Sequence, residues 1–378
     1  MPISTKTFSE VSIYYRGPLY GRLRPGSGRL APRGQMVYIE YMNLVTALLE
    51  PAAYPEPTTA VELVQTHISY VFLTDQYAYK IKKPVDLGFL NFTTLRRRHH
   101  YLKEELVLNR RLCPEIYLEV LPIAARGQGL RVGGQGHPLE YVLKMVRMPQ
   151  DRMMDEVADR GELVPEHLDR ISDRLTPFYQ QAASGPHINK YGEPAVIAYN
   201  HEENFARTQS LVGVMLDRER FEGIRAFARN FLARKRALFL RRIKEGRIRD
   251  CHGDLHMKNI CLADGVYVFD CIEFNPRFRY GDVAADIDFL AMDLDFHGFR
   301  ELSRHFVGRF AEKSRDPELL EVLDFYKCYR AYVRGKINAF TAQDPEQTPP
   351  AREQALRDAR AYFALAGEYA RVGARWAA

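Results

Sequence analysis

The pattern of apolar residues changes at Pro149, and this change limits the fold more than any other feature of the chain. Before it, β-rich runs are expected over residues 60–65, 69–73, 76–83, 117–123 and 139–146, with one strong helix over 96–112. After it, helices are expected over 162–184, 201–245, 282–296, 299–313, 316–341 and 351–374, and the polar stretch 185–200 is predicted to be a lid or substrate loop. We therefore predict an α+β fold with a small β-rich lobe (residues 42–148) and a larger, mostly helical lobe (residues 149–378).

The excess positive charge of the chain lies at its N-terminal end. Residues 1–35 are rich in Gly, Pro, Ser and Arg, and they hold six basic residues against Glu10 alone. The rest of the chain is close to neutral, so charge gives no support for a nucleic-acid partner. We interpret residues 1–41 as a disordered or mis-annotated extension, with Met36 or Met42 as the true start.

Composition excludes several further classes. The sequence has no run of 18 apolar residues and no hydrophobic signal core, so a cytoplasmic protein without a membrane partner is expected. Its five cysteines form no C-x-x-C pair, which predicts buried, reduced thiols rather than disulfides or a zinc site. Nothing in the sequence indicates an oligomeric state.

The strongest functional signal is the stretch 252–259, His-Gly-Asp-Leu-His-Met-Lys-Asn, followed by Asp270 after an apolar strand. Phosphoryl transfer from a nucleotide needs one carboxylate at the acceptor hydroxyl, and an amide oxygen and a second carboxylate on magnesium. This predicts Asp254 as the catalytic base and Asn259 and Asp270 as the metal ligands. His252 is expected to hold the loop in shape.

Two other interpretations compete for this stretch. Asp254 alone resembles an ordinary helix cap. His252, Asp254 and His256 also form an H-x-D-x-H string of the kind that binds metals in hydrolases. A metallo-hydrolase should carry further clusters of metal ligands, and His297 and His305 lack the spacing that metal ligands need. We therefore favour phosphoryl transfer. His256 is expected to face a cleft or solvent.

The N-terminal lobe should bind the nucleotide. Lys80 lies on an alternating strand and is preferred over Lys82 as the phosphate ligand, while Glu105 is preferred over Glu104 as its partner. The remaining candidates are Thr66 and Ser69, in a turn that would cradle phosphate, and Val146 and Met148, whose backbone groups would meet the adenine. There is no G-x-G-x-x-G in this lobe and no G-x-x-x-x-G-K-[ST] anywhere, which favours a small-molecule kinase over a protein kinase.

The sequence resembles the aminoglycoside phosphotransferase-like family, which has a protein-kinase-like fold. His252 to His256 with Asn259 is similar to the family's H-G-D-L-H-x-x-N, and the stretch 281–287 to its G-D-P-x-x-D-L. The stretches 79–84 and 87–90 are similar to a bacterial subgroup often fused to a P-loop ATPase domain, which we expect this chain to lack. The resemblance implies that Asp286 braces the catalytic loop and Asp282 caps the following helix. Glu273 stands three residues after Asp270, where many members have Asp-x-Glu, which puts a metal role for Glu273 in doubt.

The resemblance implies ATP and Mg²⁺ as cofactors and a hydroxyl of a small molecule (amino sugar, sugar or amino alcohol) as the acceptor. The charge of the acceptor stays open. An acidic run that we expect to form a helix cap and an exposed helix face would suit a cation, whereas a basic group on a C-terminal helix would suit an anion. The acidic run is Asp282, Asp286, Asp288, Asp293 and Asp295, and the basic group is Arg330, Arg334 and Lys336. The alternative function is a nucleotide-binding pseudokinase or regulatory module without turnover.

Overall fold

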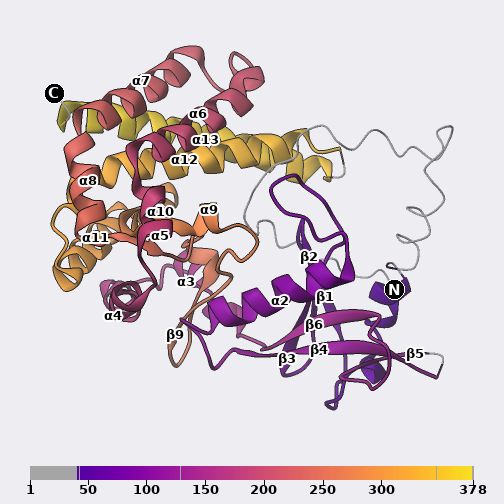
Figure 1. Cartoon of the computed structure of the whole chain (residues 1–378). Coiled ribbons are helices and arrows are strands. Elements are labelled where there is room, and N and C mark those ends of the chain that lie inside the picture. The colour runs from indigo at the N-terminus through magenta and orange to yellow at the C-terminus, as the bar shows by residue number, and fades with distance from the viewer. Residues whose placement is uncertain (1–40, 42, 128, 346, 377–378) are drawn as a thin grey trace. The chain divides into compact units, whose positions relative to one another are not determined.

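The computed structural model describes residues 41, 43–127, 129–345 and 347–376. The extension expected over residues 1–41 therefore lies outside the described residues except for Tyr41, and so do both possible start residues, Met36 and Met42. The chain divides into two compact units, Met1–Met148 and Pro149–Ala378, called here the N-terminal unit and the C-terminal unit. Each is described by itself (Figure 1). The expected α+β fold class is confirmed.

The N-terminal unit is built on one antiparallel sheet. Its strands are β1 (Glu62–Gln65), β2 (Ser69–Leu73), β3 (Tyr77–Lys82), β4 (Tyr117–Arg126), β5 (Gly129–Val132) and β6 (Glu140–Val146). They are arranged in the order β1-β2-β3-β6-β4-β5, so β6 lies between β3 and β4. Strand β5, which is not among the expected strands, lies between Gly127 and Gly133, whose φ angles are positive, and pairs with β4.

Helix α2 (Leu95–Asn109) covers one face of this sheet, as Figure 1 shows. Thr94 caps its start by accepting a hydrogen bond from the backbone N–H of Arg97 at 3.3 Å. Because side chains alternate along a strand, β3 sends Tyr79 and Ile81 into an apolar core and Lys80 and Lys82 to the opposite face. The strand thus carries both the core of the unit and its buried cations.

The C-terminal unit is mainly helical. Its helices are α3 (Met154–Asp159), α4 (Pro165–Gln181), α5 (Pro186–Asn189), α6 (Pro194–Thr208), α7 (Arg218–Arg234), α8 (Arg236–Lys244), α9 (Pro276–Arg279), α10 (Val283–Phe296), α11 (Arg300–Ser314), α12 (Leu319–Gln343) and α13 (Pro349–Trp376). The long helices α12 and α13 run side by side (Figure 1). Phe325 of α12 stacks on Phe231 of α7 with ring centroids 4.9 Å apart, which joins these helices in one aromatic core.

Short strands interrupt the helices where the candidate loop lies. Strands β8 (Ile260–Leu262) and β9 (Val266–Val268) form one hairpin, and β7 (Ile248–Asp250) pairs with β10 (Tyr280–Asp282). The predicted loop at 185–200 is wrong: the segment contains α5, a 3₁₀ turn at Lys190–Gly192 and the start of α6. Gly192 packs so closely on the Ile248 side chain that an added Cβ would lie 2.4 Å from it, so the segment is part of the core.

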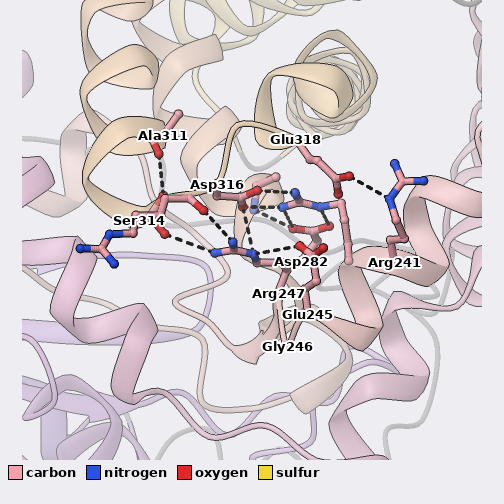
Figure 2. Close-up of polar contacts among 12 residues, drawn as sticks. Arg241, Glu245, Gly246, Arg247, Asp282, Ala311, Ser314, Asp316 and Glu318 are labelled. Atoms are coloured by element: carbon pink, nitrogen blue, oxygen red, sulfur yellow. Dashed lines mark hydrogen bonds and ion pairs between the residues drawn. The ribbon is translucent and has the colours of Figure 1, made fainter.

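A buried ion network anchors the start of α10. The Arg242 side chain, on α8, is fully buried and donates to Asp282 at 2.7 Å through Nε and Nη2, and to Asp316 at 2.8 and 2.9 Å. Figure 2 shows Asp282 and Asp316 in this network, with Arg247 donating to the Ser314 carbonyl beside it. The network ties α8, the start of α10 and the turn before α12 together.

Among the helices of the part of the chain that the structure describes, none combines the length and the apolar character needed to cross a membrane. All five cysteines are buried and unbridged, as the sequence predicted.

Candidate active site

The loop that begins at His252 is held by the carboxylate of Asp286 on α10. The backbone N–H of His252 donates to Asp286 Oδ2 at 2.6 Å, and the N–H of Gly253 donates to both Asp286 oxygens at 3.0 and 3.1 Å. Asp282 caps α10 by accepting from the Ala284 N–H at 2.9 Å. The brace and the cap expected from the resemblance are both present.

Gly253 gives this loop a shape that other residues cannot adopt without strain. Its φ is +90°, and a Cβ built on it would lie 2.7 Å from the Phe278 carbonyl oxygen and 3.1 Å from the Ile272 side chain. Both the left-handed conformation and the close approach of backbone therefore require glycine. The residue that follows in the chain is Asp254.

Two residues that were not predicted to hold this loop complete the brace. Arg330 of α12 donates through Nη1 to the Gly253 carbonyl at 3.2 Å and through Nε to the Ala285 carbonyl at 2.9 Å, and its Nη2 lies 3.4 Å from Asp286. The Tyr179 hydroxyl of α4 donates to Asp286 Oδ2 at 3.1 Å. Arg330, which we had considered as a ligand for an anionic acceptor, thus supports the loop instead.

Asp254, Asn259 and His252 lie together in this loop. The Asn259 side-chain amide nitrogen donates to the carbonyl and to Oδ2 of Asp254, each at 3.0 Å. His252 Nε2 lies 2.9 Å from the Phe269 carbonyl, and its Nδ1 accepts from the Asp254 N–H at 3.3 Å. Asn259 thus holds Oδ2 of Asp254, and His252 connects the loop to the end of β9.

His256 is buried against Asp254, so of its two expected positions, facing a cleft or facing solvent, the solvent position is wrong. Its Nε2 lies 3.3 Å from Asp254 Oδ2 outside hydrogen-bonding geometry, and its ring packs on Phe289 with centroids 5.6 Å apart. Burial alone would raise the pKa of Asp254, but His256, followed by Arg334 and His252, lowers it below the usual value. The carboxylate therefore stays ionised despite its burial.

Asp270 follows β9 in a left-handed conformation with φ of 62°. Among the described residues only Arg315 shares a positive φ without being glycine, and such strain persists where the surrounding structure imposes it. The Phe269 N–H donates to the Asn259 carbonyl at 3.0 Å, which joins the end of β9 to the loop.

A magnesium site at Asn259 and Asp270 fits the donor set. Since the Asn259 nitrogen donates to Asp254, its Oδ1 is the end left to accept a cation, and the Asp270 carboxylate supplies a second hard oxygen. Two protein ligands suit Mg²⁺, which keeps waters and substrate phosphates as its other ligands. No cluster of three or more His, Cys, Asp or Glu side chains suited to a metal occurs among the described residues, and the H-x-D-x-H alternative gains no support.

In the N-terminal unit, Glu105 of α2 binds both candidate lysines of β3. Lys80 Nζ lies 2.6 Å from Oε1 and Lys82 Nζ 2.5 Å from Oε2, and Glu105 is fully buried. Burial opposes ionisation of Glu105, but the two ammonium groups outweigh it and lower its pKa to about 2. Glu104 is half-buried and takes no part in this contact, whereas the choice between Lys80 and Lys82 stays open.

For three of the four other predicted nucleotide-binding residues, the hydrogen-bond partners lie within the N-terminal unit. Thr66 Oγ1 accepts from the N–H groups of Ile68 and Ser69 at 3.3 and 2.9 Å, so the turn uses these two donors itself. The Val146 N–H donates to the Ile116 carbonyl at 2.9 Å. Met148 ends the N-terminal unit. Thr66, Ser69, Val146 and Met148 remain predictions.

The acidic run on α10 does not form an exposed face, so that expectation was wrong. Four of its five aspartates are buried, namely Asp282, Asp286, Asp288 and Asp293. Asp293 accepts from the Met257 N–H at 3.0 Å, and Asp295 accepts from Lys327 at 2.9 Å and from the Tyr369 hydroxyl at 2.5 Å. Burial raises the pKa of Asp288 well above its ordinary value, which favours the neutral acid. The run supports the loop and the core.

Known proteins similar to this chain were compared in sequence. No protein-family model matches it. An uncharacterized protein of Mycobacterium tuberculosis is 32% identical over 316 residues, and one of Mycobacterium bovis matches equally. The matches cover 81% of this chain, which spans 62% of the length of those relatives.

Among solved structures, a choline/ethanolamine kinase family protein from Mesorhizobium loti is 13% identical with a TM-score of 0.49, covering 88% of this chain and 99% of that one. An amicoumacin kinase with AMP-PNP, Ca²⁺ and its ligand is 16% identical with a TM-score of 0.47, covering 89% of this chain and 96% of that one. An aminoglycoside phosphotransferase from Streptomyces rimosus with ADP and streptomycin is 14% identical with a TM-score of 0.40, covering 75% of this chain and 97% of that one. Similarity at this level does not establish the activity of this chain, which has to be inferred from its own residues.

Proposed function

We propose that the protein transfers the γ-phosphoryl group of ATP, with magnesium, to a hydroxyl of a small molecule of the sugar, amino sugar or amino alcohol class. The observation that carries this proposal is the Asp254 loop. A buried, ionised carboxylate has one oxygen held by Asn259, in a loop whose backbone is fastened by Asp286 and Arg330. Positioning of this kind supplies most of the catalysis in phosphoryl transfer.

In the proposed reaction, the oxygen of the acceptor hydroxyl forms a bond to the γ-phosphorus. Asp254 Oδ1 accepts the proton that this hydroxyl loses. The bond from that phosphorus to the β–γ bridging oxygen breaks, and its electron pair leaves with ADP. Magnesium, held by Asn259 Oδ1 and Asp270, would supply charge neutralisation at the phosphates. Lys80, oriented by Glu105, would bind the non-transferred phosphates, and His252 would keep the loop in register with β9.

An ATP-consumption screen over sugars, amino sugars, amino alcohols and nucleosides tests the proposal, followed by Asp254→Asn on the best acceptor. We expect turnover to fall by about 10²-fold or more, because general-base catalysis contributes on this scale, with nucleotide binding nearly unchanged. Asp264→Asn is the matched control, since Asp264 is exposed in the turn between β8 and β9. Wild-type-like turnover in Asp254→Asn would contradict the assignment.

The metal assignment has its own test. Asp270→Asn should remove the magnesium dependence of ATP binding, measured by calorimetry with and without Mg²⁺. An unchanged magnesium dependence would place the metal elsewhere. If Mg-ATP raises the melting temperature of the wild-type protein but no acceptor in the screen is phosphorylated, the nucleotide-binding alternative replaces the proposal.

A further inference from the structure

Arg279, the last residue of α9, joins two segments of the candidate active site. Its side chain is 6% exposed, and Nε and Nη2 donate to the carboxylate of Asp250, which ends β7. From the other side of the guanidinium, Nη1 donates to the carbonyl of Ile272 at 2.8 Å. Asp250 stands just before the Asp254 loop, and Ile272 stands two residues after Asp270. One side chain thus connects the start of the loop to the segment that follows Asp270.

The backbone of Arg279 lies at the same junction. The Cys251 N–H donates to the Arg279 carbonyl at 3.0 Å, which continues the pairing of β7 with β10 toward the loop. A Cβ built on Gly253 would lie 3.3 Å from the Arg279 Cα and 3.1 Å from the Ile272 side chain. Gly253, Ile272 and Arg279 therefore pack in close contact, and the main chain and the side chain of Arg279 hold the same place.

Asp270 lies between two hydrogen-bonded anchors. On one side, the Phe269 carbonyl lies 2.9 Å from His252 Nε2. On the other side, the Ile272 N–H donates to the His252 carbonyl at 3.2 Å, and the Ile272 carbonyl accepts from Arg279. The φ of Asp270 is 62°, and a residue other than glycine keeps such a conformation where contacts on both sides impose it.

We propose that Arg279 is a positioning residue, which sets the place of the Asp270 carboxylate relative to Asp254 by holding the Ile272 carbonyl. The inference rests on the proposed function for the metal that Asp270 would bind. A backbone released from the positive φ would relax to an ordinary conformation and carry the carboxylate with it. A guanidinium suits this role because its planar set of donors serves a carboxylate on one side and a carbonyl on the other.

A simpler role for Arg279 would be to neutralise Asp250, because a buried carboxylate needs a partner. The two roles use different nitrogens, so variants separate them. Arg279→Lys keeps a positive charge for Asp250, but one ammonium cannot donate on both sides. Asp250→Asn keeps an acceptor for Arg279 and leaves the bond to Ile272 in place. The double variant Asp250→Asn, Arg279→Met removes the bond to Ile272 without leaving a buried charge alone, and it should fold because such replacements are often neutral in stability.

The first measurement is calorimetry with AMP-PNP, in which the ratio of Kd without Mg²⁺ to Kd with saturating Mg²⁺ reports the contribution of the metal. Arg279→Lys and the double variant should lower this ratio about ten-fold, in line with the loss of one hydrogen bond from a charged group. The metal-free Kd should stay unchanged, which separates this effect from a general loss of structure. Asp250→Asn should keep the ratio.

The matched control is Arg277→Gln, which changes the arginine two residues earlier on α9. Arg277 donates to Asn200 at 2.9 Å and to Glu203 at 2.6 Å, both on α6. It is thus an arginine of the same short helix with bonds that lead away from Ile272. Arg277→Gln should keep the Mg²⁺ ratio.

The second measurement is hydrogen exchange, followed by mass spectrometry, on the full chain without metal or nucleotide. Peptides that contain residues 270–274 should exchange about ten-fold faster in Arg279→Lys and in the double variant, because the segment opens more often once its carbonyl anchor is lost. Peptides of α13 should keep the wild-type rate, and so should every peptide of Asp250→Asn.

An unchanged Mg²⁺ ratio in both variants of Arg279, unchanged exchange at residues 270–274, or equal effects in Asp250→Asn or Arg277→Gln would overturn the inference. None of these outcomes affects the proposed phosphotransfer, which depends on ATP consumption and on Asp254→Asn. If the wild type binds no Mg-nucleotide, the proposed function is contradicted, and the exchange rates alone then decide whether Arg279 holds the segment.

Discussion

Replacing Arg242 with Met tests whether buried charge anchors the helix that braces the Asp254 loop. Arg242 makes four hydrogen bonds of 2.7 to 2.9 Å to Asp282 and Asp316, whose side chains are 1% and 3% exposed. Met fills similar space but leaves two buried carboxylates without their shared cation. Asp282 keeps the Ala284 N–H, and Asp316 keeps Arg247, with Nε 3.7 Å away. The loss is therefore partly compensated.

Protonation limits the cost of this change. Neutralising an aspartate with a reference pKa of about 3.9 at pH 7 costs about 4 kcal/mol, so two would cost about 8 kcal/mol. Because Asp282 and Asp316 each retain a partner, we expect Arg242→Met to lower the free energy of unfolding by about 4 kcal/mol, the cost of neutralising one carboxylate. This agrees with the 3–5 kcal/mol, roughly, that follows the breaking of a buried ion pair.

The assay is urea unfolding followed by far-UV circular dichroism, with Arg241→Met as the control. Arg241 is the adjacent residue on α8 and binds Glu318 at 2.8 Å, but its side chain is 50% exposed, so its loss should cost only about 0–1 kcal/mol (Figure 2). A carboxyl whose folded pKa is raised destabilises the protein increasingly as the pH rises above its unfolded pKa. The penalty in Arg242→Met should therefore shrink by up to about 1.4 kcal/mol per pH unit between pH 7 and 5. Equal losses in the two variants, or a penalty independent of pH, would refute the reasoning.

Three further predictions concern titratable groups. Since the folded pKa of Lys336 is lowered to about 7 from an ordinary 10.5, the unfolded state binds more protons between these values. The unfolding free energy should therefore rise with pH in that window, by up to about 1.4 kcal/mol per unit, and Lys336→Met should remove the rise. Glu105→Gln removes a carboxylate that two buried ammonium groups contact and should lower both the melting temperature and the affinity for Mg-ATP. The half-buried neighbour gives the control Glu104→Gln, and equal effects of the two variants would count against Glu105. His256→Gln should raise the pKa of Asp254 and shift the acidic limb of the pH profile of kcat/KM upward, and an unshifted limb would show that His256 does not act on it.

Local patterns in the sequence were enough for much of the fold. Strand β2 has the predicted bounds, because an alternating β-branched and aromatic run lies between turn residues. The helices at 185–200 were missed because Gly and Pro were taken as loop signals. Pro186 and Pro194 instead occupy the first turn of α5 and α6, where a missing N–H costs no hydrogen bond.

The site was predictable to the extent that its contacts are local. Asp254 and Asn259 are five residues apart, and the turn between them brings amide to carboxylate. The bond from Arg330 to the Gly253 carbonyl spans 77 residues, and no spacing rule reaches that far. His256 was expected to face a cleft or solvent because a polar loop residue usually does. It is buried instead, its ring packs on Phe289, and it lowers the pKa of Asp254.

From charge alone, the acidic run and the basic group were equally good candidates to bind the acceptor. In the structure, burial and partners within the chain account for the acidic run and for Arg330. The α10 carboxylates are buried in the fold: Asp286 and Asp293 accept from loop N–H groups, and Asp282 accepts from Arg242. Arg330 is likewise engaged, with backbone carbonyls as its acceptors. A residue whose polar atoms are engaged by its own chain positions the loop and contributes little to the choice of substrate.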